Sequence, residues 1–242
     1  MSENKQVLIA SVPDGPLREN NFEVRSGPVP APEDGQVLLR TLALTIGAGQ
    51  RAGLQGSASY AGAPRAGIVM GGPGVATVAA SRSSALRAGD VVVAPTGWQD
   101  YSVHDPEQLQ GVEPGTDPAF QLGALGTNGL TAYFGLLRIG FPRKEETVVV
   151  SAAAGSVGHI AGQIAKIQGC TVVGVAGSDE KCEMLTGELG FDTAVNYKRE
   201  DFRAAFKDAT PKRIDVYFDN TGGEILGSAL FLPDLLFGKL FL

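Results

Sequence analysis

The first part of the chain alternates short apolar runs with polar turns. Four runs rich in β-branched and other apolar residues lie at 6–10, 36–40, 67–70 and 90–94. Clusters of Pro, Gly and Asp separate them, and few long helical patterns interrupt them. We therefore predict an antiparallel β-barrel or sandwich over residues 1–118.

From residue 119 to residue 242 the pattern changes, because apolar strands now alternate with helices. The segments between the strands carry apolar residues at positions i, i+3, i+4 and i+7. This alternation predicts a doubly wound parallel sheet, and with it the α/β fold class. The predicted strands are 147–151, 171–176, 193–197 and 214–220, and the predicted helices are 126–140, 157–165, 180–189 and 201–207.

A Gly-rich turn joins the first of these strands to its helix, with the sequence AAAGSVG at 152–158. Gly155 lets the backbone approach a diphosphate, and Gly158 lets the helix and strand pack closely. Together with Ser156 and Val157 they precede a helix whose N-terminus offers free N–H groups and the positive end of its dipole. Two glycines at this spacing are also found in purely structural turns, but this context predicts a dinucleotide site.

The end of the second strand bears on the choice between NAD and NADP. An NAD site usually has an acidic residue there, which binds the ribose 2′-hydroxyl. Here Gly177 and Ser178 follow Ala176, and the first carboxylate is Asp179. A carboxylate about 4 Å from a 2′-phosphate would be repelled by roughly 4 kcal/mol at an effective dielectric constant of about 20. NADP is therefore favoured, with Lys181 as the candidate counter-charge, although an exposed helical lysine is the simpler interpretation.

Composition and charge narrow the classes of partner. The chain has 242 residues, 43% of them hydrophobic, and 33 are glycine, a surplus that indicates many tight turns. Its net charge is −6 and its pI about 5.0, so it has no basic field for nucleic acid or anionic lipid. Its polar start lacks a signal-peptide pattern, and no run reaches the roughly 20 apolar residues of a membrane helix. We expect a cytoplasmic protein.

The sequence predicts no metal site. Its two histidines, His104 and His159, form no set of ligands with cysteine or glutamate at metal-binding spacing. His159 is close enough to the Gly-rich turn to face a cofactor, but a surface role at the helix N-terminus is the simpler interpretation. Cys170 and Cys182 are interpreted as reduced core residues.

Several motifs resemble those of the zinc-independent medium-chain dehydrogenase/reductases. Within that family the match is to the group of leukotriene B4 dehydrogenase, prostaglandin reductase and 2-alkenal reductase. The similarity extends to about Leu230, in family order. Its motifs are VLLRTLALTI, MGGPGVATVAAS, AGDVVVAPTGWQDY, LGALGTNGLTAYFGL, AAAGSVG, GCTVVGVAGSDEK, ELGFDTAVNYK and DVYFDNTGGE.

The resemblance implies a GroES-like barrel domain followed by a Rossmann domain, with NADP(H) as cofactor. It also implies reduction of the carbon–carbon double bond of α,β-unsaturated aldehydes or ketones, by hydride transfer to the β-carbon. By family position, Lys181 and Tyr197 flank the 2′-phosphate, Asn220 approaches the cofactor, and Tyr60 lines the substrate pocket. An ordinary loop tyrosine is nearly as good an interpretation of Tyr60. The family forms homodimers.

The sequence departs from the family near the expected nicotinamide end. The usual Asp-Pro-Tyr-Met-Arg is Gly-Ala-Gly-Gln-Arg at 47–51, and the usual Met-Pro of a Gly-Met-Pro-Gly turn is Thr127-Asn128. In the first segment two bulky side chains become small. We take a roomier substrate pocket as the hypothesis.

A second departure lies after Asn220. The family continues with further strands and a glycine-rich loop, whereas here an apolar segment, 230–242, follows. We therefore expect an incomplete Rossmann domain that lacks the family's next strand and dimer edge, in a chain that is truncated or internally deleted. Two alternatives to the reductase remain open: a non-catalytic NADP-binding fragment, and a zinc-free quinone reductase.

Overall fold

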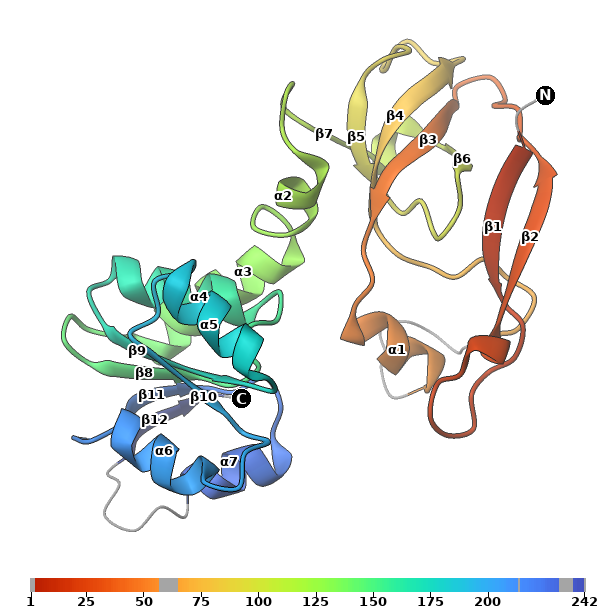
Figure 1. Ribbon diagram of the computed structural model, residues 1–242. Helices are drawn as coiled ribbons and strands as arrows, with labels where there is room; N and C mark the ends of the chain where they lie inside the picture. The colour runs from red at the N-terminus through yellow and green to blue at the C-terminus, as the bar shows by residue number, and fades with distance from the viewer. Residues whose placement is uncertain (1–2, 57–64, 213, 231–236, 242) are drawn as a thin grey trace. The chain divides into compact units, whose positions relative to one another are not determined.

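The structure is a computed structural model that describes residues 3–56, 65–212, 214–230 and 237–241 (Figure 1). The chain divides into two compact units, unit 1 (Met1–Leu122) and unit 2 (Gly123–Leu242). The sequence pattern places the change of architecture near residue 118, and the structure divides the chain after Leu122. Each unit is described by itself.

Unit 1 is mostly antiparallel β-structure. Its strands are β1 (Glu3–Ile9), β2 (Phe22–Pro28), β3 (Val37–Leu44), β4 (Gly74–Ser81), β5 (Val91–Ala94), β6 (Tyr101–His104) and β7 (Gln110–Gly111). Its short helices are η1 (Glu19–Asn21), α1 (Ala48–Leu54), η3 (Pro106–Gln108) and α2 (Pro118–Leu122).

Two antiparallel sheets form unit 1. β1 pairs with β2, and a five-stranded sheet has the order β6-β3-β4-β5-β7. Val37, Leu39, Ala76 and Val78 of β3 and β4 are fully or almost fully buried and form the centre of one core cluster. Leu38 and Val75 are buried as well, so the first residues of both strands are covered on both faces of the sheet. The expected GroES-like β-domain is confirmed.

Unit 2 alternates strands and helices. Its strands are β8 (Thr147–Val150), β9 (Thr171–Ala176), β10 (Thr193–Asn196), β11 (Ile214–Phe218) and β12 (Phe237–Phe241). Its helices are α3 (Thr127–Tyr133), the π-helical η4 (Phe134–Gly140), α4 (Gly158–Ile167), α5 (Asp179–Gly187), α6 (Phe202–Ala209) and α7 (Gly223–Leu230). None of the described helices is both long enough and apolar enough to span a bilayer.

The strands of unit 2 form one parallel sheet in the order β10-β9-β8-β11-β12. The expected Rossmann-type sheet is therefore confirmed. One expectation is wrong: the apolar segment near the C-terminus does not leave β11 without its next neighbour. β12 pairs with β11 in parallel, with Ile214 opposite Phe237 and Phe218 opposite Phe241. Among the described residues the sheet thus has five parallel strands rather than four.

The helix predicted over 126–140 changes type along its length. α3 is regular from Thr127, and from Phe134 the segment is π-helical until Gly140. Phe141 then takes a left-handed conformation with φ 44°, and Pro142 follows. A proline cannot donate the next helical hydrogen bond, so the helix ends where the sequence predicted.

Apolar clusters cover both faces of the parallel sheet. On one face α4 packs through Ala161 and Ala165 against the sheet, and on the other α6 packs through Phe202 and Phe206. α4 approaches the Phe191 segment very closely at Gly162, where an added Cβ would collide with the Phe191 ring. Phe191 is only 3% exposed, so its ring has little freedom to move aside.

Gly162→Ala is expected to destabilise unit 2 by about 1–3 kcal/mol, because overpacking displaces a buried ring. Gly187→Ala is the matched control, since no atom lies within 4 Å of an added Cβ there. That control should be neutral or stabilising by up to about 1 kcal/mol, because alanine favours a helix. Urea unfolding followed by circular dichroism measures both. Equal midpoints for the two variants would contradict the tight contact.

Candidate functional site

The candidate site lies at the carboxyl ends of the parallel strands, around β8. The strand order reverses direction between β8 and β11, since β9 and β10 follow on one side of β8 and β11 and β12 lie on the other. In open parallel sheets, ligands bind outside the carboxyl ends of the strands at such a switch point. The Gly-rich turn, residues 152–158, follows β8 at this place.

The turn after β8 is tightly folded. Ala152 has a left-handed backbone with φ 45°, and its carbonyl oxygen accepts a hydrogen bond from Gly155 N at 2.8 Å. A Cβ on Gly158 would collide with that same oxygen and lie 2.9 Å from Ala153 Cα. Position 158 therefore requires glycine, and the close packing of helix on strand that the sequence predicted is present.

The start of α4 leaves hydrogen-bond donors for a ligand. Within the described part of the chain, the backbone N–H groups of Ser156, Val157 and Gly158 donate to no protein acceptor. Ser156 and Gly155 are exposed, and an added Cβ on Gly155 would lie 3.0 Å from Ala152 O. Free N–H groups at a helix N-terminus, with the positive dipole end behind them, suit an anion. The residues present therefore fit a diphosphate.

His159 supports the turn. Its Nδ1 lies 2.8 Å from Gly155 O, and its backbone N–H donates to the same oxygen at 3.0 Å. Because a carbonyl only accepts, Nδ1 carries the proton in this contact. His159 thus fixes the Gly155 peptide from the first turn of α4. The sequence indicated a surface position for it but did not predict this contact.

A polar network joins the ends of β8 and β11. Ser151 Oγ donates to Asp219 Oδ1 at 2.5 Å and accepts from Asn220 N at 2.7 Å. Asn220 Nδ2 donates to Ser151 O at 2.8 Å. The other Asp219 oxygen accepts from Gly222 N at 2.8 Å, which shapes the turn before α7. The network therefore holds Asn220, exposed beside the Gly-rich turn, in one orientation.

Below this network lies Tyr217, which is fully buried. Burial disfavours its phenolate form, and the Asp219 carboxylate repels it, so the pKa of Tyr217 is raised above its ordinary value. The phenol of Tyr217 therefore stays neutral.

The two residues expected near a 2′-phosphate follow neighbouring strands. Lys181 is exposed on the first turn of α5, where its backbone N–H donates to the N-cap Ser178 Oγ at 3.4 Å. Tyr197 directly follows β10, and its N–H donates to Ala176 O at 3.0 Å. A Cβ on Gly177 would lie 3.1 Å from Tyr197 Cε1, so glycine at this position leaves room for the tyrosine ring. Glycine also brings no carboxylate to the strand end.

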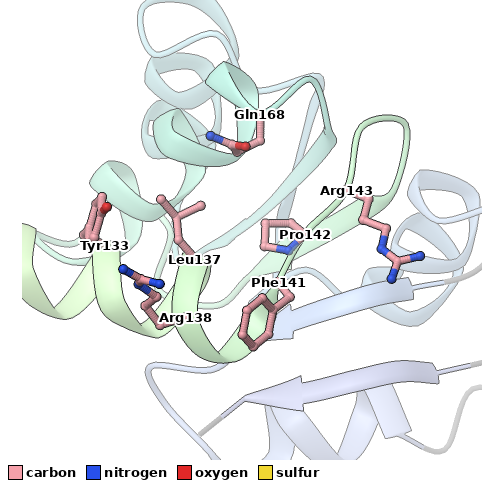
Figure 2. A pocket seen from close by; sticks show the side chains of 7 residues that line it. All are labelled: Tyr133, Leu137, Arg138, Phe141, Pro142, Arg143 and Gln168. Atoms are coloured by element: carbon pink, nitrogen blue, oxygen red, sulfur yellow. The ribbon is translucent and has the colours of Figure 1, made fainter.

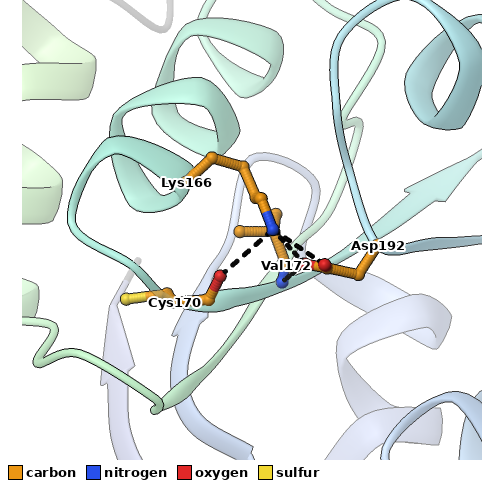
Figure 3. A network of polar contacts seen from close by, with 4 residues as sticks. All are labelled: Lys166, Cys170, Val172 and Asp192. Atoms are coloured by element: carbon orange, nitrogen blue, oxygen red, sulfur yellow. Dashed lines mark hydrogen bonds and ion pairs between the residues drawn. The ribbon is translucent and has the colours of Figure 1, made fainter.

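A second contact fixes the far end of α4 (Figure 3). Lys166 Nζ donates to both Asp192 oxygens, at 2.7 and 2.8 Å, and Asp192 also accepts from Val172 N at 2.6 Å. Partial burial raises the pKa of Asp192, but the hydrogen bonds from Lys166 and Val172 outweigh it, so the pKa lies below its ordinary value. Helix α4 is thereby tied to β9 and to the loop before β10.

Both cysteines belong to the core of unit 2, as the sequence indicated. Cys170 is 3% exposed, and Cys182 packs against the same cluster. Burial, together with the Glu146 and Asp215 carboxylates, raises the pKa of the Cys170 thiol to about 11. Burial also raises the pKa of Cys182. Neither thiol is activated for nucleophilic chemistry.

An open hollow of about 440 Å³ in unit 2 lies away from the Gly-rich turn (Figure 2). Gln168, which lines it, caps the C-terminal end of α4, whereas the turn precedes the N-terminal end. Ten helical residues separate these ends by about 15 Å. The hollow is lined by Tyr133, Leu137, Arg138, Phe141, Pro142, Arg143 and Gln168.

The segment at 47–51 begins helix α1. Gln50 Oε1 accepts from Gly47 N at 2.6 Å, and Gln50 Nε2 donates to Thr45 O and Gly71 O, both at 3.0 Å. Gln50 thus ties α1 to the Gly71 turn, a role that the sequence did not predict. Tyr60, the residue expected in the substrate pocket, lies outside the described residues.

Thr127-Asn128, the other departure from the family motif, lies at the start of α3. A Cβ on Gly129 would collide with Ala124 O. Gly129 is therefore required by packing.

Comparison with known families divides the chain as the structure does. Residues 5–112 match the N-terminal domain of oxidoreductase, and residues 156–233 match the family described as zinc-binding dehydrogenase. Despite the second description, the described residues hold no group of three or more His, Cys, Asp or Glu side chains suited to a metal ion.

The chain is 39% identical to the NADP(+)-dependent 2-alkenal reductase of Nicotiana tabacum, over 94% of this chain and 68% of that protein. It is 41% identical to the NADPH-dependent curcumin reductase of Escherichia coli, over 94% of this chain and 66% of that protein. The chain belongs to the zinc-independent medium-chain dehydrogenase/reductases. It spans about two thirds of the length of these curated relatives.

A solved structure agrees with this assignment. The crystal structure of CurA from Vibrio vulnificus in complex with NADPH has a TM-score of 0.89 and 38% identity, covering 98% of this chain and 70% of that one. Both of these curated relatives are named for NADP(H), and the CurA structure contains NADPH, which agrees with the cofactor that the strand end after Ala176 indicated.

Gly155→Val is expected to weaken NADPH binding about tenfold or more, because its side chain would occupy the space above the free N–H groups at the start of α4. Gly155 is exposed and its φ is not positive, but an added Cβ would lie 3.0 Å from Ala152 O, so the turn should shift locally while the rest of the fold persists. Fluorescence titration of NADPH and a circular dichroism spectrum check both points, with Gly187→Ala as control. Unchanged affinity would exclude this turn as the diphosphate site.

Asp192→Asn is expected to lower stability near neutral pH by about 1 kcal/mol, since the side chains of Asp192 and its partner Lys166 are 39% and 32% exposed. A lowered carboxylate pKa stabilises the fold above the unfolded value of 3.8 and loses this effect as pH falls below it. The gap between wild type and variant should therefore close in acid. Urea midpoints across this range measure it. Asp208→Asn, an exposed control on α6, should show no such pH-dependent gap.

Proposed function

We propose that this chain binds NADP(H) and reduces the carbon–carbon double bond of α,β-unsaturated aldehydes and ketones. The observation that carries the proposal is the cradle after β8, where three free N–H groups and two glycines fit a dinucleotide diphosphate. The printed activities of the relatives, an alkenal reductase and a curcumin reductase, support the substrate class.

Each candidate residue has a role in this proposal. Ser156, Val157 and Gly158 hold the diphosphate through their backbone N–H groups, and Gly155, whose own N–H donates to Ala152 O, lets the diphosphate approach the backbone. Asn220 is held by Ser151 through its Nδ2, so its Oδ1 is left to accept from the cofactor.

At the outer strand ends, Lys181 supplies positive charge for a 2′-phosphate and Tyr197 flanks it. Tyr60 lines the substrate pocket in unit 1, where we place it by family position alone.

NADPH, when bound, supplies a hydride to the β-carbon of the substrate. A proton from water then completes the α-carbon, so one enal, one NADPH and one proton give one saturated aldehyde and one NADP⁺. Hydrogen-bond donors near the carbonyl oxygen lower the barrier, since negative charge develops there. No residue is assigned to this last role.

The replacements at 47–51 bear on substrate size. The family's bulky side chains are absent, and Gln50 is turned onto the backbone of Thr45 and Gly71. We retain the hypothesis of a roomier pocket, which favours bulky enones over acrolein-sized ones. We also propose that the enzyme acts in the cytoplasm.

The proposal is tested with the purified chain by following NADPH oxidation with a 2-alkenal, a bulky enone, acrolein or a quinone. The expected result is NADPH loss that depends on the enal or enone, with the saturated carbonyl as product and a higher kcat/KM for the bulky enone. NADPH binding is measured in parallel by fluorescence titration.

Two other outcomes would overturn the proposal, and a third would reject one part of it. Oxidation with the quinone alone indicates a zinc-free quinone reductase. NADPH binding without turnover of either acceptor indicates a non-catalytic NADP-binding protein. Equal turnover of acrolein and bulky enones rejects only the roomier pocket.

A further inference from the structure

The first carboxylate after β9 belongs to Asp179, which shares the first turn of α5 with Lys181, the residue expected beside a 2′-phosphate. Asp179 is the third residue after Ala176, and its side chain is 64% exposed. A carboxylate near the end of the second strand favours the 2′-hydroxyl of NAD and repels the 2′-phosphate of NADP. A chain that uses NADP therefore needs a way to weaken the field of Asp179.

The segment after β10 supplies this. Asn196 Nδ2 donates to Asp179 Oδ1 at 2.9 Å, and Arg199 Nη1 lies 3.6 Å from the same oxygen. The amide fixes the carboxylate, and the guanidinium opposes its charge. Arg199 also pairs with Asp201, at 3.6 Å through Nε, so it is held between two acids.

The same segment carries other groups expected at this end of the cofactor. Tyr197 contacts the β9 end through Ala176 O, and Lys198 Nζ lies 6.0 Å from the centre of the Tyr197 ring. Exposed ion pairs contribute little to folding stability. The pair between Arg199 and Asp179 therefore matters chiefly through the local electrostatic field.

Resting on the proposed function, we propose that Arg199 is a positioning residue for cofactor choice, which acts through Asp179. By pairing with that carboxylate it removes the repulsion toward a 2′-phosphate, while Lys181 adds direct positive charge. Without Arg199 no positive charge opposes the Asp179 carboxylate. The affinity for NADPH and 2′,5′-ADP then falls, whereas the affinity for NADH and 5′-AMP is nearly unchanged.

The test compares Arg199→Ala, Asp179→Asn and the double variant with wild type. Affinities for NADPH, NADH, 2′,5′-ADP and 5′-AMP are measured by fluorescence or calorimetric titration, which needs no turnover. Arg203→Ala is the matched control, because Arg203 is an exposed arginine on α6 and its loss changes the net charge equally.

Arg199→Ala should lower the affinity for NADPH and 2′,5′-ADP by about tenfold at low salt. The affinity for NADH and 5′-AMP should change by less than about twofold. The double variant should bind NADPH within about twofold of wild type, since no carboxylate then needs an opposing charge. Arg203→Ala should change the affinities for the ligands with and without a 2′-phosphate equally and only slightly.

Two results would overturn the inference while the proposed function stands. One is an unchanged preference for NADPH in Arg199→Ala. The other is a double variant that binds NADPH as weakly as Arg199→Ala does, which would mean that Arg199 contacts the phosphate itself. Failure of the wild-type chain to bind either NADPH or 2′,5′-ADP would instead overturn the proposed function, and this inference with it.

Discussion

The approach of helix α4 to the end of β8 is the constraint on which the candidate site depends. The Ala152 carbonyl lies where a Cβ of residue 158 would be, so only glycine allows the helix to begin there. The left-handed Ala152 backbone turns that carbonyl under the helix, at a cost that the surrounding contacts must offset. As a result the first N–H groups of α4 face the space outside the sheet.

Three groups of contacts in the rest of unit 2 keep the Gly-rich turn and α4 in place. Ser151 and Asp219 join β8 to β11 at one side of the turn, and Lys166 ties the far end of α4 to Asp192. At the outer strands the side chains that follow β9 and β10 contact one another. Most of these groups sit at the ends of strands, so the positions of the strands in the sheet determine the geometry of the site.

The sequence predicted the parts of this structure that local patterns encode. Apolar runs located β8 to β11, and glycines between strand and helix located the turn. It could not predict that the segment at 237–241 pairs with β11, because parallel pairing joins distant segments and no turn signal marks it. The contacts of Gln50, His159 and Arg199 were also missed. Each depends on where a flexible side chain ends, and residue spacing does not determine that.

The order of strands also bears on how unit 2 folds. β8 and β9 are close in sequence, but Asn220 and Ser151, which meet at the switch point, are 69 residues apart. Contacts between distant segments form slowly, because the entropy of closing a long loop is lost before any contact compensates for it. β9, β10 and their helices lie between these two residues in the chain, although β8 and β11 are neighbours in the sheet. The orientation of Asn220 therefore depends on a long-range contact, whereas the Gly-rich turn is held by local ones.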